Sequence, residues 1–165
     1  MFALFLWLAG SMATSSTFER AISYNPLSLI QAGRKEDIYR YYRRDAVVAM
    51  QGTRDKQDRG HHFRVDRVEG FHVVTAGYGP KGSKHAGVSI AFNTSIFELN
   101  NITQIAYPSD PLLQGRILAC RTKRPGKDMT FICAYFPPQN TDGSASKVYH
   151  LMIDWTHDLL QNLPG

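Results

Sequence analysis

Short apolar runs, most of them rich in β-branched or aromatic residues, recur along the chain and predict strands. The clearest run, residues 46–50, is continuous and stops just before Gly52. A run of that length is typical of a strand buried on both faces. The hairpin predicted around the Arg-Pro-Gly-Lys-Asp segment at residues 124–128 has the turn residues that such a connection needs. The predicted strands span residues 21–25, 46–50, 71–78, 88–92, 102–107, 116–123 and 130–136.

Helical periodicity appears twice. Near the C-terminus, Val148, Leu151, Met152, Trp155 and Leu159 recur with the spacing of one helix face. Either of two serines, at positions 144 and 146, can cap the start of that helix. An earlier apolar face, between residues 27 and 42, is interrupted by a glycine at position 33 that predicts a fresh helical turn.

Residues 54–67 are dominated by charge and carry the adjacent His61 and His62. Neighbouring histidines point in different directions on any regular element, so this segment is predicted to be a loop rather than a metal site. The whole order of elements is strand, helix, strand, several antiparallel strands and helix. That order predicts an α/β domain with a mixed sheet.

Length and composition give the expected size of the domain and its net charge. The chain has 165 residues, 43% of them hydrophobic, which suits one domain with a real core. Its net charge of +5 suits a polyanionic partner such as nucleic acid, and equally an ordinary solvated surface. Two cysteines are too few for a disulfide framework or a zinc site. A turn at Gly126 and Lys127 would place Cys120 directly opposite Cys133.

The first ten residues are apolar but too few to span a bilayer, so no stable membrane span is predicted. They resemble the hydrophobic region of a secretory signal, without its basic start, and are equally compatible with a spurious upstream segment. We therefore divide the chain into residues 1–17, a signal-like or spurious N-terminus, and residues 18–165, the domain.

Five motifs occur in a suggestive order. They are Ser-Tyr-Asn-Pro-Leu-Ser-Leu at 23–29, Asp-Ala-Val-Val-Ala-Met-Gln-Gly-Thr-Arg at 45–54, Ala-Gly-Val-Ser-Ile-Ala at 86–91, Gly-Arg at 115–116 with Phe-Ile-Cys-Ala-Tyr-Phe-Pro at 131–137, and the helix at 155–164. Together they resemble the endonuclease/exonuclease/phosphatase superfamily. The greatest similarity is to the apurinic-endonuclease-like domains of LINE-type (non-LTR) retrotransposons. The resemblance covers residues 18–165 and corresponds to the N-terminal half of the family's domain.

The resemblance implies a two-layered β-sandwich flanked by helices, here a truncated one. It also implies hydrolysis of phosphate esters with a divalent metal, usually Mg²⁺. In the family a Glu at the end of the second strand holds the metal. An Asp of a Gly-Asp-Phe-Asn motif activates water, and a late Asp-His pair and a Tyr-x-Pro tyrosine contact the phosphate.

Carried over by position, Asn25 matches the active-site Asn and Tyr135 the phosphate-contacting Tyr. Gly52 stands at the metal-binding Glu, so no metal ligand is predicted. The later Asp-Asn and Asp-His motifs have no counterpart in these residues, and the histidines at 85, 150 and 157 do not fall at the family's position. From the residues alone, Asn25 could instead cap a turn, and Tyr135 could belong to the core.

Three loop cations, Arg54, Lys81 and Lys84, are candidate phosphate contacts or else solubilising charges. Arg116 is predicted to brace the fold. A carboxylate at Asp55 or Asp58 could reach a metal, although nothing in the sequence requires it.

The resulting hypothesis is a truncated, degenerate DNA endonuclease domain of retroelement type, inactive or weakly active, with DNA as its partner. No protein partner is implied. The alternatives are a non-catalytic nucleic-acid-binding remnant and a secreted nuclease or phosphatase of the same superfamily. The family favours an intracellular or nuclear location, whereas the apolar N-terminus favours secretion. A half-domain is also expected to leave sheet edges and apolar faces uncovered.

Overall fold

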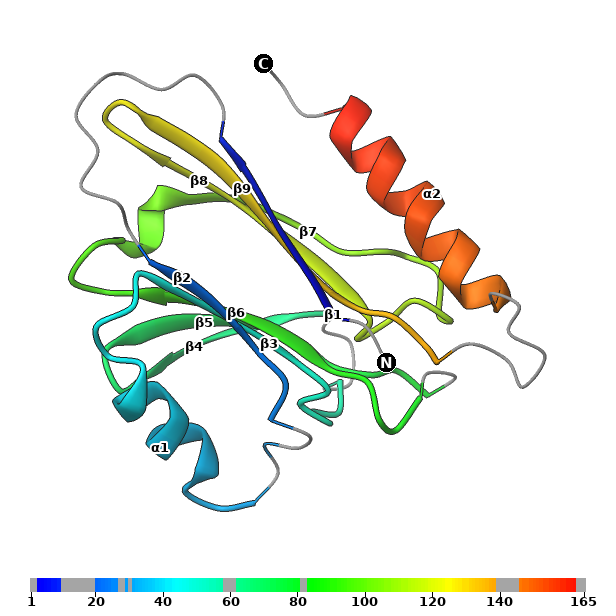
Figure 1. Cartoon of the computed structure of the whole chain (residues 1–165), viewed down its shortest axis with the longest axis horizontal. Coiled ribbons are helices and arrows are strands. Elements are labelled where there is room, and N and C mark those ends of the chain that lie inside the picture. The colour runs from blue at the N-terminus through cyan, green and yellow to red at the C-terminus, as the bar shows by residue number, and fades with distance from the viewer. Residues whose placement is uncertain are drawn as a thin grey trace.

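The predicted α/β class is confirmed by the computed structural model, whose described part contains two sheets and two α-helices (Figure 1). The structure describes residues 3–9, by their backbone only, and residues 20–26, 29, 31–57, 62–80, 83–138 and 146–162. None of the helices in these ranges is long and apolar enough to cross a membrane.

The first sheet has five strands in the order β2-β3-β6-β5-β4. Its central strands are buried along their whole length, as the continuous apolar run at residues 46–50 predicted. Only β2 and β3 run parallel, and the other pairs are antiparallel. The strands are β2 (Ala21–Tyr24), β3 (Val47–Gln51), β4 (Arg64–Val68), β5 (Phe71–Ala76) and β6 (Val88–Asn93).

The second sheet has four antiparallel strands in the order β1-β9-β8-β7. The apolar N-terminal segment supplies β1 (Ala3–Ala9), which pairs along β9 with Ala3 opposite Tyr135. A short 3-10 turn, η1 (Leu99–Asn101), leads into β7. The other strands are β7 (Ile102–Ala106), β8 (Ile117–Arg124) and β9 (Lys127–Tyr135).

The two sheets face each other across one apolar core. Phe92 of β6 meets Phe131 of β9 edge to face, with ring centroids 5.6 Å apart. Small and branched side chains such as Ala49, Ile90 and Leu118 fill the space around them. Burial of this apolar surface on both inner faces is the main force that holds the two sheets together.

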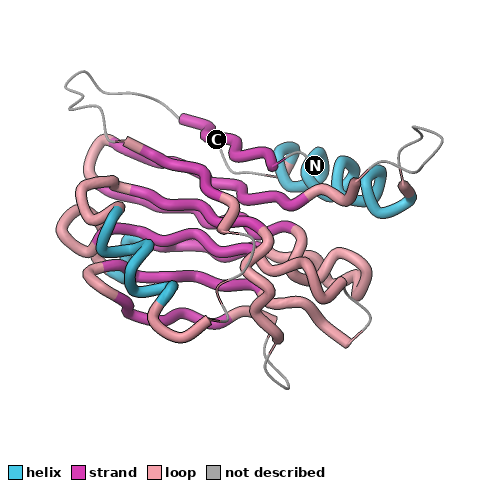
Figure 2. The backbone as a smooth tube through the Cα atoms, turned by 60° about the horizontal axis from the view of Figure 1, so that its bottom comes forward, coloured by secondary structure: helices cyan, strands magenta, loops and turns pink. Residues whose placement is uncertain are grey.

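Each outer face carries a helix (Figure 2). Helix α1 (Arg34–Tyr41) packs Tyr39 against Phe71, with centroids 5.3 Å apart. Helix α2 (Lys147–Gln161) buries Met152 on the four-stranded sheet, and Ser146 caps it by accepting from Tyr149 N. These helices cover apolar surface that the half-domain resemblance had led us to expect exposed.

The structure corrects two of the sequence-based predictions. The charged segment 54–67 is not all loop, because Arg64 begins β4. The two cysteines are not opposite each other: Leu118 faces Cys133, and Cys120 faces Phe131. The reason is the turn, which consists of Pro125 and Gly126 and shifts the pairing. Both thiols are free and buried, and burial raises the pKa of Cys133 to about 12.

The strand directions bring many loops to one edge of the sandwich. At this edge β2, β3, β5, β7 and β9 end, and β1, β4, β6 and β8 begin. We call it the site end, because the predicted functional positions fall there.

Candidate functional site

Gly52 lies where Asn25 and Tyr135 meet. Strands β2 and β3 are parallel and Tyr24 pairs with Met50, so Asn25 and Gly52 leave the sheet at the same edge. A Cβ atom built on Gly52 would lie 3.0 Å from Asn25 Oδ1 and 3.4 Å from Tyr135 Cε2. Three positions far apart in the sequence therefore converge on one point.

The backbone of Gly52 is left-handed, with φ of +67°. Side chains of L-residues rarely tolerate this conformation, whereas glycine adopts it freely. Arg54 has φ of +59°, which is uncommon for a residue with a side chain. Strain of this kind gathers at functional sites and is held in place by the surroundings.

Hydrogen bonds from the start of β6 hold this turn. The amides of Thr53 and Arg54 donate to the carbonyls of Gly87 and Ala86, at 3.0 and 2.9 Å. A Cβ atom on Gly87 would lie 2.3 Å from Thr53 Oγ1, so this close approach requires glycine. The close contact with Thr53 thus explains the glycine in the Ala-Gly-Val motif at residues 86–88.

Arg116 braces Tyr135 from the neighbouring strand. Tyr135 N donates to Arg116 O at 2.7 Å, and Arg116 Nη1 donates to Tyr135 O at 3.2 Å. Burial lowers the pKa of the Arg116 guanidinium, and the Tyr135 phenol partly offsets that effect. This geometry agrees with the bracing role predicted for Arg116.

Two of the three predicted cations are described, and both lie on loops of the site end. Arg54 is half-buried, and Lys84 is exposed on the turn that precedes Ala86. Lys81 lies outside the described residues. The exposed Lys56 adds a cation that sequence reasoning missed, although its position two residues after Arg54 was a usable signal.

The residues present do not fit the Mg²⁺ ion that the resemblance implies. Magnesium sites use oxygen ligands that include one or two carboxylates, and Gly52 offers none. Asp55, the first carboxylate after it, accepts instead from Arg64 Nη2 at 2.9 Å. Within the described ranges, no three His, Cys, Asp or Glu side chains gather in a group that could hold a metal.

The Asp55–Arg64 pair belongs to a small ionic network under α1. Arg64 Nε also donates to Asp66 Oδ2 at 2.8 Å, and Lys35 Nζ lies 3.6 Å from the same oxygen. Burial lowers the pKa of Arg64, but the facing carboxylates outweigh it and raise that pKa overall. Asp55 is therefore paired with Arg64 through Oδ1, while its buried Oδ2 accepts no hydrogen bond.

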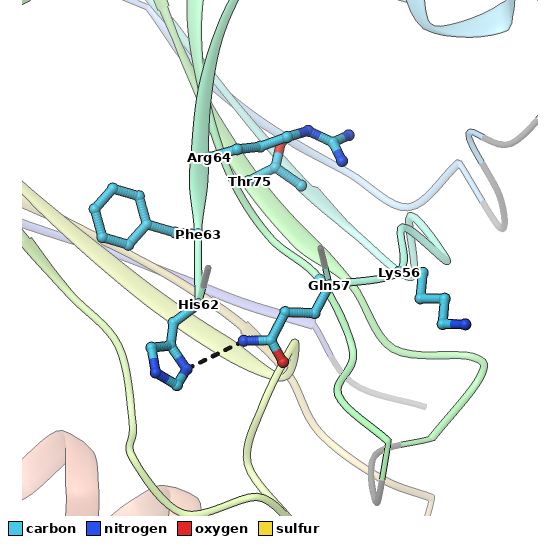
Figure 3. A pocket seen from close by; sticks show the side chains of 7 residues that line it. Lys56, Gln57, His62, Phe63, Arg64 and Thr75 are labelled. Carbon is cyan, nitrogen blue, oxygen red and sulfur yellow. Dashed lines mark hydrogen bonds between the residues drawn. The ribbon is translucent and has the colours of Figure 1, made fainter. Parts of the chain in front are cut away.

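A shallow hollow lies beside this network (Figure 3). Gln57 Nε2 donates to His62 Nδ1 at 3.1 Å across it. Sequence reasoning placed His62 in a loop and gave it no role. Gln57 is close to His62 in the sequence, but Thr75 and Gly77, which line the same hollow, come from another segment that no local pattern connects to His62.

Comparisons of the chain with protein-family models, curated proteins and solved structures found no match. An amide, a phenol and a half-buried guanidinium can bind phosphate oxygens through hydrogen bonds and charge. The three atoms nearest the Cβ position of Gly52 belong to Asn25 and Tyr135, and none of them is a carboxylate oxygen that could place a metal or take a proton from water.

Proposed function

We propose that this chain derives from a retroelement-type DNA endonuclease domain that has kept its phosphate-binding end and lost its metal ligand. In this proposal it binds nucleic-acid backbone and does not hydrolyse it efficiently. The observation that carries the proposal is the convergence of Asn25, Gly52 and Tyr135 on one point.

The arrangement of the elements supports the lineage. Two facing sheets with a helix on each outer face are compatible with the sandwich expected of the endonuclease/exonuclease/phosphatase fold. The three motif positions lie at the ends of three different strands, with Asn25 after β2, Gly52 after β3 and Tyr135 at the last residue of β9. Their contact is the arrangement that a common phosphate site requires.

The loss of catalysis follows from the chemistry at Gly52. Metal-assisted hydrolysis needs an ion that neutralises the phosphate and a group that activates water. Changes even in the groups that support metal ligands cost about 10–100-fold in affinity or activity, so a missing ligand costs at least as much. Glycine cannot supply the charge, and Asp55 is bonded to Arg64.

Binding of the phosphate backbone does not require the metal, because it rests on charge and hydrogen bonds. Arg54 and Lys56 follow β3 and Lys84 precedes β6, so these three cations lie on loops of the site end, and Lys81 is close to Lys84 in the sequence. Non-specific binding of this kind typically has a dissociation constant of about 10⁻⁴ to 10⁻⁶ M and weakens steeply with salt.

The test compares two arginines at opposite ends of the sandwich. Arg54 lies at the site end, whereas the exposed Arg44 lies just before β3, at the other end. Binding of labelled DNA would be measured by fluorescence anisotropy at several salt concentrations. We expect Arg54→Ala to weaken DNA binding several-fold. It should also reduce the slope of the logarithm of the binding constant against the logarithm of the salt concentration by about one. Arg44→Ala should bind like the parent chain.

Two results would contradict the proposal. If Arg54→Ala and Arg44→Ala bind DNA equally well, the site end is not the binding site. The unaltered chain could also nick supercoiled plasmid in the presence of Mg²⁺, with nicking abolished by EDTA. That result would show metal-dependent hydrolysis and contradict its proposed loss.

A further inference from the structure

A second feature of the site end is a cluster of aromatic rings. His62 and Tyr107 stack nearly parallel, with centroids 5.2 Å apart and planes inclined by 20°. Phe63 packs on the same tyrosine at 5.3 Å. His62 is exposed and Tyr107 half-buried. Because His62 precedes β4 and Tyr107 follows β7, the stack lies at the site end.

Tyr107 also lines a groove between β7 and α2. The groove has a volume of about 310 Å³, which is near the lower limit for small-molecule sites and suits one flat ring system. Apolar and aromatic side chains form its walls, and two polar side chains of α2 form its rim. The walls are Ile105, Tyr107, Trp155 and Leu159, and the rim is Asp158 and Asn162.

The lining excludes phosphate and favours a base. A carboxylate at Asp158 and the apolar walls oppose an anion in the groove. Asn162 Nδ2 donates to the main-chain carbonyl of Asp158 at 2.7 Å, which leaves its amide oxygen as an acceptor. Two acceptors on the rim match the exocyclic amino group of cytosine or adenine.

Charge around the cluster fits the same ligand. Lys56 is exposed beside Gln57, whose amide holds the His62 ring in place (Figure 3). Arg54 and Lys84 lie on neighbouring loops of the site end. A strand whose phosphates follow these cations would carry its bases past the exposed face of the aromatic stack.

We propose that His62, Tyr107 and the groove beside Trp155 form a stacking site for an unpaired nucleobase of single-stranded nucleic acid. The inference rests on the proposed function, because the backbone contacts of the site end bring the strand to the rings. Bases inside a duplex are already stacked, so the site selects single strands. Stacking on aromatic side chains tolerates any base, and the rim acceptors add a preference for amino-bearing ones.

The test separates bases from backbone. An oligo(dC) strand and an abasic strand of equal length would be titrated against a Trp7→Phe variant, in which Trp155 is the one remaining tryptophan. We expect oligo(dC) to quench Trp155 fluorescence and to bind about tenfold more tightly than the abasic strand. Oligo(dT) should fall between the two.

Variants of His62 test the stack itself. His62→Ala should weaken oligo(dC) binding about five- to tenfold and leave abasic binding unchanged, whereas His62→Phe, which keeps a ring, should bind like the parent. Arg54→Ala should weaken both strands equally. Circular dichroism would confirm that the variants fold.

Each alternative outcome is decisive. Equal binding of oligo(dC) and abasic strands, both weakened by Arg54→Ala, would overturn the stacking site and leave the proposed function standing. Absence of binding to either strand would overturn both. Equal losses in His62→Phe and His62→Ala would show that stacking is not the interaction. A concentration-dependent Trp155 signal without DNA, with dimers in sedimentation, would assign the groove to a second copy of the chain.

Discussion

At the scale of single residues, the backbone of Gly52 limits which side chains can stand directly after β3. Its φ of +67° is a conformation that glutamate would adopt only under strain. A glutamate there would also crowd Asn25, whose Oδ1 lies 3.0 Å from the Cβ position. Placing a glutamate at position 52, as the resemblance implies for a metal ligand, would therefore require a shift of the turn as well as the substitution.

The strain at Gly52 can be measured against a matched glycine. Gly70 has φ of +79° and no atom within 4 Å of its Cβ position. We expect Gly70→Ala to lower the free energy of unfolding by about 1–2 kcal/mol through backbone strain alone. Gly52→Ala should lower it further, because Asn25 must also move. Urea unfolding of both variants measures the difference. Equal losses of unfolding free energy would show that Asn25 moves away from the new methyl group at no cost.

At the residue scale, the sequence can predict which edge of a sheet a residue lies at when that residue stands at a strand end. Asn25, Gly52 and Tyr135 each follow or end a strong apolar run, so their shared edge follows from strand direction. The stack of His62 on Tyr107 had no such signal. It joins two loops whose meeting depends on the packing of both sheets.

At the scale of elements, the hairpin of β4 and β5 explains the largest error in the predicted strands. The β4 sequence Arg-Val-Asp-Arg-Val is charged because β4 is an edge strand with partly exposed side chains. Its turn consists of Glu69 and Gly70, both with positive φ, at 46° and 79°. Such a two-residue turn is typical of a type I′ hairpin, and the Glu-Gly pair before Phe71 was the signal available.

That turn predicts a stabilising substitution. Asparagine adopts positive φ more readily than glutamate, so Glu69→Asn should raise the free energy of unfolding by about half a kcal/mol. The change also removes the contact between Glu69 Oε1 and Arg40 Nη2 at 3.0 Å, an exposed ion pair worth about 0–1 kcal/mol. Glu69→Gln is the control, because it removes the charge and keeps the backbone preference. Thermal unfolding should rank Asn above Gln, and the reverse order would refute the turn argument.

At the scale of the whole molecule, the N-terminal segment completes the four-stranded sheet. β1 lies along the full length of β9, from Ala3 opposite Tyr135 to Ala9 opposite Met129. Most of β9 is buried, and without β1 its outer edge would present unpaired backbone groups. Sequence reasoning saw only a short apolar run here, because the strand that it pairs with lies near the other end of the chain.

Replacing residues 3–9 with a Gly/Ser sequence of equal length should therefore expose the β9 edge and promote association between copies of the chain. A buried, apolar strand of that length is a template for intermolecular pairing once its edge is free. Light scattering coupled to size-exclusion chromatography would detect the resulting oligomers. The same replacement of residues 139–145, a polar segment of equal length, controls for loss of sequence alone. If the 3–9 variant stays as monomeric and as stable as the control, β1 is not needed to prevent association through the β9 edge. The prediction would then be wrong.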